Sequence, residues 1–222
     1  MSELLTDRIL AENAAVFEAM VSHRFVHDIE ADRLPVEVFD RYLLIEGAFV
    51  ETAIAIFGYA VVKATDLDDR RKLIASLDAL ANEQMPYFEA AFVQRGIAPD
   101  PTLQAEPRVA AFRDGMLAIA RDGDFSAIIT AMFAAEWMYW TWCDAIRQAP
   151  MSDPMVRDWI EMHAAPGFAA QARWLRDRLD ALGAQMTPAQ RDEAVRVFGE
   201  VQRLEIDFHA AAYVESELSP VA

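Results

Sequence analysis

The sequence predicts an all-α protein, a single-domain helical bundle that spans residues 1–222. Apolar residues recur at steps of three and four along most of the chain, which is the spacing of one face of a helix. The 8 glycines lie mostly between these periodic segments, and alternating β-branched residues joined by hairpin dipeptides are absent. With 222 residues, of which 54% are apolar, the chain is long enough to bury one sizeable core.

The first half of the chain is expected to form four helices, separated where the apolar pattern is interrupted. The first twenty residues carry acids among apolar residues at helical spacing. Residues 96–101 read Gly-Ile-Ala-Pro-Asp-Pro, which cannot continue a helix. We therefore expect helices near 2–20, 21–31, 36–64 and 67–95.

The second half is also expected to form four helices. Gly123 separates the first two of them. The last has the clearest start, because Thr187 offers an N-cap hydroxyl, Pro188 suits the first helical position and Gln190 follows three residues after the cap. The expected helices lie near 105–122, 124–148, 153–182 and 188–217.

Charge and cysteine content exclude several classes of function. The net charge of −16, without any Lys/Arg-rich run, repels a polyanionic backbone, so nucleic acid is not an expected partner. Cys143 is the single cysteine, which excludes an intrachain disulfide and a cysteine-based zinc site and is typical of a reducing compartment. The first twenty residues lack a basic segment followed by an unbroken apolar run, so no export signal is expected. These features predict a cytoplasmic protein.

The run from Phe125 to Trp142 is long and apolar enough to raise the question of a membrane span. It carries Glu136 near its middle, however, and belongs to an acidic chain whose other helices are amphipathic. A buried core helix explains the run better, and no membrane association is expected.

Three of the predicted helices have an apolar face that is interrupted by one glutamate. Glu205 is at the centre of such a face in the last helix, Glu46 in the third and Glu136 in the sixth. The neighbours that define these faces include Phe198, Val201 and Phe208 for the last helix, Tyr42, Leu43 and Phe49 for the third, and Met132, Phe133 and Tyr139 for the sixth. All three glutamates are therefore expected to point inward.

An unpartnered carboxylate taken out of water costs several kcal/mol or takes up a proton. Three such groups are best accommodated if they converge on a site. The alternative is that an arginine, a tyrosine hydroxyl or water satisfies each of them separately.

Aromatic residues follow the three glutamates by one turn. Phe49 and Phe208 each stand three residues after a glutamate, and Tyr139 stands three residues after Glu136. A cavity that combines rings and acids suits a flat, nitrogen-rich ring, which stacks on aromatic faces while its amino edge donates to a carboxylate. Taken singly, each aromatic side chain is better explained by core packing.

Metal and nucleophile sites are less well supported. Carboxylate-bridged di-metal centres in helical bundles use Glu-x-x-His, and that spacing is absent at all three glutamates. His23 and His27 lie four residues apart without the glutamate of a zinc-protease motif, so we assign them structural roles. Cys143 has no adjacent histidine and is expected to be inert in the core. We predict neither a metal nor a cofactor.

Several short motifs, in this order and spacing, resemble the TenA family of thiaminase II-like proteins. They are His-Arg-Phe-Val-His at 23–27, the Leu-Pro pair at 34–35 followed by Phe-Asp-Arg-Tyr-Leu at 39–43, Ala-Ala-Glu-Trp-Met-Tyr-Trp-Thr-Trp at 134–142, Trp-Ile-Glu-Met-His at 159–163 with Phe168, and Leu-Glu-Ile-Asp-Phe at 204–208. The resemblance covers most of the chain. It implies a haem-oxygenase-like helical fold that need not bind haem, and a homo-oligomer, either dimer or tetramer.

Members of this family divide by whether a cysteine or a glutamate stands in the middle of the sixth helix, and Glu136 is similar to the glutamate branch. For that branch the resemblance implies thiamine salvage. The expected reaction is hydrolysis of 5-aminomethyl-2-methylpyrimidin-4-amine, or of its N-formyl precursor, toward the hydroxymethylpyrimidine.

The resemblance also implies roles for individual residues. Glu205 matches the family's catalytic acid/base, and Glu46 stands where an aspartate holds the aminopyrimidine edge. Our hypothesis is that Glu46 orients the ring, Glu205 protonates the departing nitrogen, and Glu136 and Tyr139 manage the water or nucleophilic step. The remaining expected substrate-binding residues are Phe49, Phe112, His163 and Phe208.

The chain departs from the family pattern at four positions. Phe49, Phe112 and His163 replace tyrosines, and His209 stands where a tryptophan often follows the phenylalanine. Two other classes of function therefore remain open: a metal-dependent oxidase on the same scaffold, and a non-catalytic ligand-binding or regulatory protein.

Overall fold

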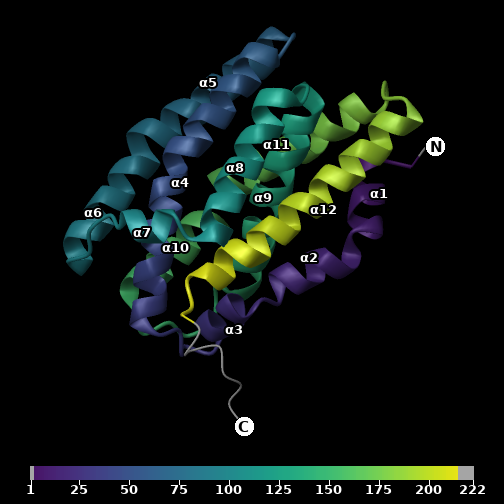
Figure 1. The fold of residues 1–222 in the computed structure, drawn as a ribbon. Helices are drawn as coiled ribbons and strands as arrows, with labels where there is room; N and C mark the ends of the chain where they lie inside the picture. Colours follow the sequence, from purple (N-terminus) through teal and green to yellow (C-terminus); the bar gives the residue numbers. More distant parts are fainter. Residues whose placement is uncertain (1–2, 215–222) are drawn as a thin grey trace.

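A computed structural model describes residues 3–214, and no strand occurs among them. The helices, labelled as in Figure 1, are α1 (Leu5–Glu12), α2 (Ala14–Val21), α3 (Arg24–Glu30), α4 (Val36–Lys63), α5 (Leu67–Ala79), the π-helical turn η1 (Leu80–Gln84), α6 (Met85–Arg95), α7 (Pro101–Gln104), α8 (Pro107–Asp122), α9 (Phe125–Ile146), α10 (Pro154–Ala164), α11 (Pro166–Gly183) and α12 (Pro188–Ala211). The all-α class is confirmed.

Most of the predicted helices are present, but two of them are interrupted. The helix expected over 2–20 breaks at Asn13, whose side-chain amide donates to the carbonyls of Ile9 and Val195, each at 3.0 Å. The helix expected over 153–182 breaks at Ala165, because Pro166 starts a new helix there and lacks the N–H that continuation needs. Residue 2 and residues 215–217, which were included in two predicted helices, lie outside the described residues.

The bundle is organised around α9. This helix packs against α11 and α12, with α10 at its other end, and half of its residues are buried. Figure 1 shows α4, α5 and α6 on one side of the bundle and α1, α2 and α12 on the other, with α8, α9 and α11 between them. Buried apolar side chains from all these layers form one continuous core.

The ends of the helices are fixed by caps. The capping box predicted for α12 is confirmed. The Thr187 hydroxyl accepts from the backbone N–H of Gln190, and the side-chain oxygen of Gln190 accepts from the backbone N–H of Thr187. Gly96 ends α6 in the left-handed region at φ 66°, which costs glycine little. These local signals explain why sequence alone locates the helix boundaries here.

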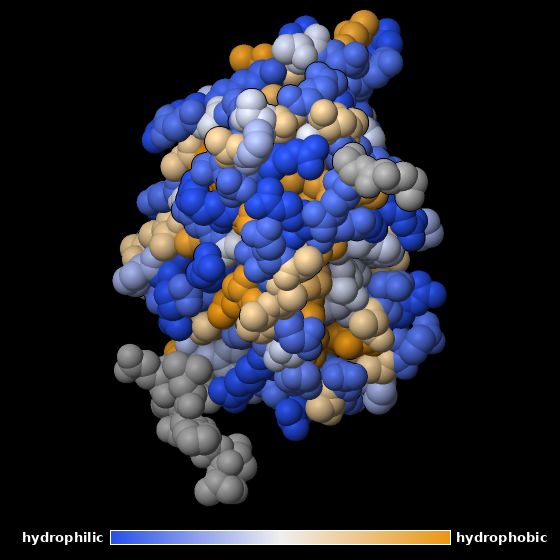
Figure 2. All heavy atoms as spheres, turned by 90° about the vertical axis from the view of Figure 1, so that its right-hand side faces the viewer, coloured by the Kyte–Doolittle hydropathy of each residue, from blue (hydrophilic) through white to orange (hydrophobic). Residues whose placement is uncertain are grey.

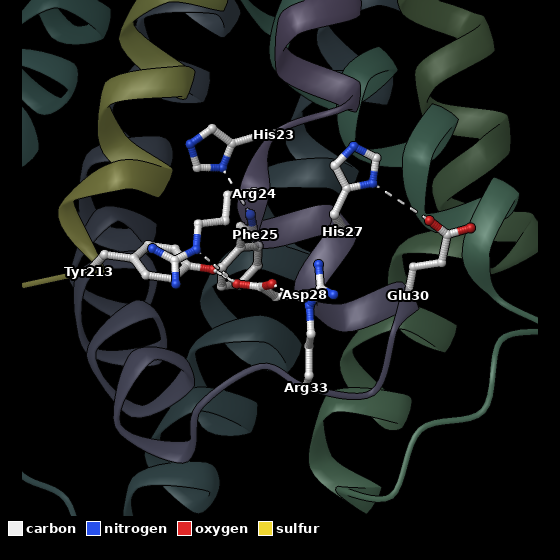
Figure 3. Close-up of polar contacts among 8 residues, drawn as sticks. All are labelled: His23, Arg24, Phe25, His27, Asp28, Glu30, Arg33 and Tyr213. Atoms are coloured by element: carbon white, nitrogen blue, oxygen red, sulfur yellow. Dashed lines mark hydrogen bonds and ion pairs between the residues drawn. The ribbon is translucent and has the colours of Figure 1, made fainter. Parts of the chain in front are cut away.

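A cluster that we call the Asp28 clasp ties α3 to the end of α12 (Figure 3). Asp28 is buried and accepts hydrogen bonds from Arg24 at 3.2 Å, from Arg33 at 2.9 Å and from the Tyr213 hydroxyl at 2.8 Å. Tyr213 stands two residues beyond the last residue of α12. The clasp therefore joins α3 to the last described residues of the chain.

One helix of the described part, α4, is long and apolar enough to cross a membrane by length and composition alone. In the structure it packs against α5, α6, α8 and α9, and it carries buried Glu46. The run from Phe125 to Trp142 lies within α9, at the centre of the bundle. The face drawn in Figure 2 is mostly hydrophilic, with hydrophobic residues between the hydrophilic ones.

Candidate active site

A cavity of about 550 Å³ lies between α4, α8, α9 and α12 and extends to α5, α10 and α11. This volume is typical of small-molecule sites. Every residue that the sequence singled out for the site contributes to the wall: Glu46, Phe49, Phe112, Glu136, Tyr139, His163, Glu205 and Phe208. The structure thus brings these side chains together from distant parts of the chain, while their roles in binding and catalysis stay predictions.

Glu46 is held by one hydrogen bond, which the Trp159 indole donates to its Oε2 at 2.8 Å. Burial raises the pKa of Glu46 to about 8, opposed first by the Trp159 hydrogen bond and then by the polar hydroxyl of Tyr42, one turn earlier on α4. Nε2 of His163 lies 3.8 Å from Oε1.

Glu205 is fully buried, and neither of its carboxyl oxygens has a hydrogen-bond partner among residues 3–214. Burial, and then the nearby charge of Glu46, raise its pKa well above the usual range. A carboxyl group in this setting keeps its proton at neutral pH and can act as an acid.

His209 lies one turn after Glu205 on α12. Its Nδ1 donates to the Glu205 backbone carbonyl at 2.8 Å and stands 3.6 Å from the carboxyl Oε2. Burial lowers the pKa of His209 to about 3, so the ring is neutral at neutral pH. Glu205 is therefore flanked by an uncharged imidazole.

Glu136 stands at a second polar region of the cavity, with Gln171 of α11. Burial raises the pKa of Glu136 to about 8, opposed first by the approaching Gln171 amide and then by the charge of Lys72. Both side-chain polar atoms of Gln171, and Oε2 of Glu136, are buried without a hydrogen-bond partner in the described part of the chain. A ligand that reaches this region could use both atoms of that amide.

Aromatic rings form the remaining walls. Phe112 lies with its ring centroid 4.5 Å from that of Phe49 and 4.6 Å from that of Phe208. On another wall the rings of Tyr139 and His163 are 5.3 Å apart. These walls can stack against a flat heterocycle.

Three of the residues that surround the site were not identified from the sequence: Tyr42, Trp159 and Gln171. Tyr42 lies on the same helix face as Glu46, and that spacing was a usable signal. Trp159 and Gln171 reach the site from α10 and α11, and no local pattern predicts such long-range partners.

The histidine pair and the cysteine that were set aside lie outside the cavity wall. Cys143 is buried, is not among the described residues that line the cavity, and has a thiol pKa raised well above its usual value by burial. His23 caps α3 by accepting from the Phe25 N–H, and His27 is half exposed and lies 3.7 Å from Glu30 (Figure 3). Within residues 3–214 no three His, Cys, Asp or Glu side chains are grouped so as to hold a metal ion.

A family model described as TENA/THI-4/PQQC matches residues 11–215 of the chain. Among curated proteins, the aminopyrimidine aminohydrolase of Halalkalibacterium halodurans is 25% identical over 204 residues, covering 90% of this chain and 91% of that protein. The aminopyrimidine aminohydrolase of Helicobacter pylori is 22% identical over 209 residues, covering 92% and 96%. A solved TenA homologue from Pyrococcus furiosus superposes with a TM-score of 0.86 at 20% identity, covering 95% of this chain and all of that one.

Proposed function

The chain belongs to the TENA/THI-4/PQQC family, and from this premise we propose that it is an aminopyrimidine aminohydrolase of thiamine salvage. It is a hydrolase that acts on a C–N bond. The observation that carries the proposal is the meeting of three carboxyl groups on one ring-lined cavity, those of buried Glu46 and Glu205 and of partly buried Glu136. The substrate is 5-aminomethyl-2-methylpyrimidin-4-amine or its N-formyl form.

Glu46 binds the amino edge of the pyrimidine. The ring lies against Phe112 and its neighbours Phe49 and Phe208, and the Tyr139 and His163 rings limit the other side. Because Trp159 already fixes one carboxyl oxygen of Glu46, the other oxygen is left to accept from the substrate.

Glu205 supplies the proton for the departing nitrogen. As the C–N bond breaks, the departing nitrogen takes the carboxyl proton, while water adds to the methylene carbon. The water loses one proton and becomes the hydroxyl of the product, and that proton finally restores Glu205. Each cycle consumes one water and releases one ammonia from the free amine, or one formamide from the N-formyl compound.

Glu136 and Tyr139 hold the attacking water. They stand three residues apart on α9, so both side chains lie on one face of that helix. Glu136, when ionised, accepts the proton that the water loses. Its pKa of about 8 lets it exchange a proton near neutral pH.

The environment of the enzyme follows from its surface and its cysteine. A net charge of −16 disfavours nucleic acid as a partner, and the single buried thiol fits a cytoplasmic protein. The protein is a homodimer or homotetramer, for which Val62 and Val93, 77% and 84% exposed, are candidate contacts. Light scattering tests the assembly, and a monomer mass at micromolar concentration would contradict it.

The proposed reaction is tested by measuring ammonia release from the free amine, formamide release from the N-formyl compound, and the product mass for both. Wild type should turn over at least one of them, and Glu205→Gln should lose about a hundredfold or more of the rate. Glu200→Gln, an exposed change on the same helix, is the matched control and should keep the wild-type rate.

Two outcomes would contradict the proposal. Equal activity of wild type and Glu205→Gln removes Glu205 from the acid role. Absence of turnover with both substrates, together with thermal stabilisation by the ring, identifies a binding protein instead. Stoichiometric iron or manganese in the purified protein would favour the oxidase alternative.

A further inference from the structure

The cavity extends along α4 well beyond Glu46, which holds the ring in the proposed function. Its wall on this helix includes Glu46, Val50, Ala53 and Phe57, so it runs from position 46 to position 57, about 16 Å along the helix. The aminopyrimidine is one ring with small substituents, and it lies at the Glu46 end of this wall. About two turns of α4, from Val50 to Phe57, therefore line space that the ring does not fill.

The α8 helix lies beside this part of α4 and runs in the same direction. The Phe112 ring lies 4.5 Å from the Phe49 ring. Further along both helices, Lys63 donates to the Ala120 carbonyl at 2.8 Å. Met116 stands between these two contacts on α8 and lines the cavity, so it faces the unfilled space beside the second half of α4.

The α9 helix runs in the opposite direction along α4. The Tyr139 hydroxyl lies 2.8 Å from the hydroxyl of Tyr42, in the first half of α4. Just before α9 begins, the Gly123 carbonyl accepts a hydrogen bond from Lys63, the last residue of α4. Met132 stands between these contacts and lines the cavity, so it approaches the same space from α9.

The part of the cavity beyond the ring is enclosed and apolar, and we call it the apolar end. Four buried residues line it: Ile56, Phe57, Met116 and Met132. The exposed residues of the cavity wall lie on other elements: Ala75, Glu83 and Gly167. The cavity therefore opens between α5, η1 and the start of α11, and its apolar end is held between α4, α8 and α9. Methionine side chains at such an end adapt to the shape of an alkyl group.

Gln171 reaches the cavity between the ring and the opposite part of the wall. Three residues before it on α11, the Phe168 ring lies 5.0 Å from the ring of His163. Three residues after it, the Trp174 ring lies 6.0 Å from the Lys72 ammonium group on α5. Gln171 therefore stands between His163, at the ring-binding part of the cavity, and Lys72, which lines the cavity further along.

The side-chain amide of Gln171 needs a ligand to complete its hydrogen bonds. Its Nε2 and Oε1 are buried, and neither has a partner within residues 3–214. The ammonium group of a free amine can only donate, so it leaves Nε2 without an acceptor. An acyl carbonyl on the departing nitrogen accepts from Nε2, which a buried donor strongly favours.

We infer that the cavity binds an N-acyl group on the departing nitrogen, with the acyl carbonyl at Gln171 and a short alkyl chain in the apolar end. The inference rests on the proposed aminohydrolase function and specifies its substrate class. The preferred substrates are aminopyrimidines whose acyl chain is longer than formyl, because formyl has no carbon that reaches the apolar end.

The reaction of such a substrate follows the same course. Water forms a bond to the methylene carbon, and the bond from that carbon to the amide nitrogen breaks. The nitrogen takes the Glu205 proton, and the acyl group leaves as a primary carboxamide. The proton lost by the water restores Glu205, so one water is consumed for each hydroxymethylpyrimidine and carboxamide formed.

A series of N-acyl aminopyrimidines tests this inference. The formyl, acetyl, butanoyl and hexanoyl compounds are compared by kcat/KM, measured from the mass of the pyrimidine product, and by Kd, measured by calorimetry. Each methylene group that enters the apolar end should raise kcat/KM by up to about fourfold. The butanoyl compound should therefore exceed the formyl compound by about tenfold or more, and its Kd should be lower.

Variants on α4 and α9 locate the chain. Ala53→Leu fills the space in front of the apolar end, so the ratio of butanoyl to formyl kcat/KM should fall to about one. Ala55→Leu is the matched control, because Ala55 is exposed on the same helix and is not among the described residues that line the cavity. Met132→Ala enlarges the apolar end and should raise the ratio of hexanoyl to butanoyl. Thermal unfolding checks that each variant is folded.

The outcomes separate the inference from the proposed function. If wild type turns over the formyl compound but neither kcat/KM nor affinity improves with chain length, the inference is wrong and the function stands. An equal butanoyl preference in wild type and folded Ala53→Leu places the chain elsewhere and also overturns the inference. If no compound is turned over, the proposed function fails, and the Kd series alone then decides whether the acyl chain binds.

Discussion

The indole nitrogen of Trp159 donates a 2.8 Å hydrogen bond to Glu46 across 113 positions of sequence. It joins α10 to α4. It is also the largest of the effects that oppose the rise in pKa caused by desolvation of this carboxyl group. Without it, burial alone would push the pKa of Glu46 higher still. The pair therefore keeps Glu46 within reach of ionisation near neutral pH, and this has consequences for the stability of the whole protein.

Stability should fall as the pH rises from about 6.5 to 8. Glu46 and Glu136 have folded-state pKa values of about 8, against 4.5 for the ordinary side chain. Between those values the unfolded chain has lost protons that the folded chain must keep, so each group lowers the free energy of unfolding by at most about 1.4 kcal/mol per pH unit.

At acidic pH, buried histidines make the free energy of unfolding rise with pH, which is the opposite of the carboxyl effect. The pKa values of His163 and His209 are lowered from 6.5 to about 4 and about 3, so acid favours the unfolded chain, which binds the protons. Between pH 4.5 and 6.5 the carboxyl and imidazole contributions oppose each other. Urea unfolding at a series of pH values should show a plateau there. Glu46→Gln should reduce the alkaline slope, and stability that rises from pH 6.5 to 8 would contradict these assignments.

Cys143 should be dispensable for catalysis. The thiol is buried in α9 with a raised pKa, so native protein should react with a thiol reagent far more slowly than protein unfolded in urea. Cys143→Ala should keep kcat within about threefold while costing about 1–2 kcal/mol of stability from the small cavity it leaves. A complete loss of turnover in a folded Cys143→Ala protein would instead indicate a thiolate mechanism.

Gln171 should determine how well an acylated substrate is used. Its amide offers both a donor and an acceptor to the cavity, which matches the carbonyl and N–H of a formamide. Gln171→Leu should lower kcat/KM for the N-formyl compound about tenfold and leave the free amine within about threefold. Gln185→Leu, at an exposed position beyond α11, is the control. An equal loss on both substrates would remove this role.

Gly47 should be required where α4 meets α6. A Cβ at this position would lie 2.6 Å from the Phe92 ring and 3.1 Å from Phe88, so Gly47→Ala should destabilise the protein by about 1–3 kcal/mol and displace the neighbouring Glu46. At Gly58, on the same helix, an added methyl group would have no described atom within 4 Å, and Gly58→Ala should instead stabilise by about 0.5–1 kcal/mol. Thermal denaturation of the two variants measures both effects. Equal shifts in Tm would contradict the close approach of Phe92 to Gly47.

The helical period accounts for what the sequence could predict about the site. A face repeated at three and four residues places Glu46, Glu136 and Glu205 on the buried sides of their helices, and the structure has all three on one cavity. The capping box at Thr187 was equally accessible, because both of its partners lie within one turn.

Features that depend on distant parts of the chain could not be predicted in this way. Asn13 breaks the first helix by donating to Val195, which is far away in sequence. The hydrogen bond that the Trp159 indole donates to Glu46 likewise depends on how separate helices pack, and so does the approach of Gln171 to Glu136. Periodicity indicates which way a side chain faces, but it does not identify what it meets.

The Asp28 clasp and the position of α12 bear on how the protein is made. During synthesis the helices that carry Glu46 and Glu136 leave the ribosome well before Glu205, and Tyr213 follows later still. Until then the apolar flank of α9 that α12 covers has no partner and stays exposed to other proteins. The nascent chain should therefore depend on chaperones until its last helix emerges, and a ribosome that stalls before that point would release an aggregation-prone fragment without a finished binding pocket.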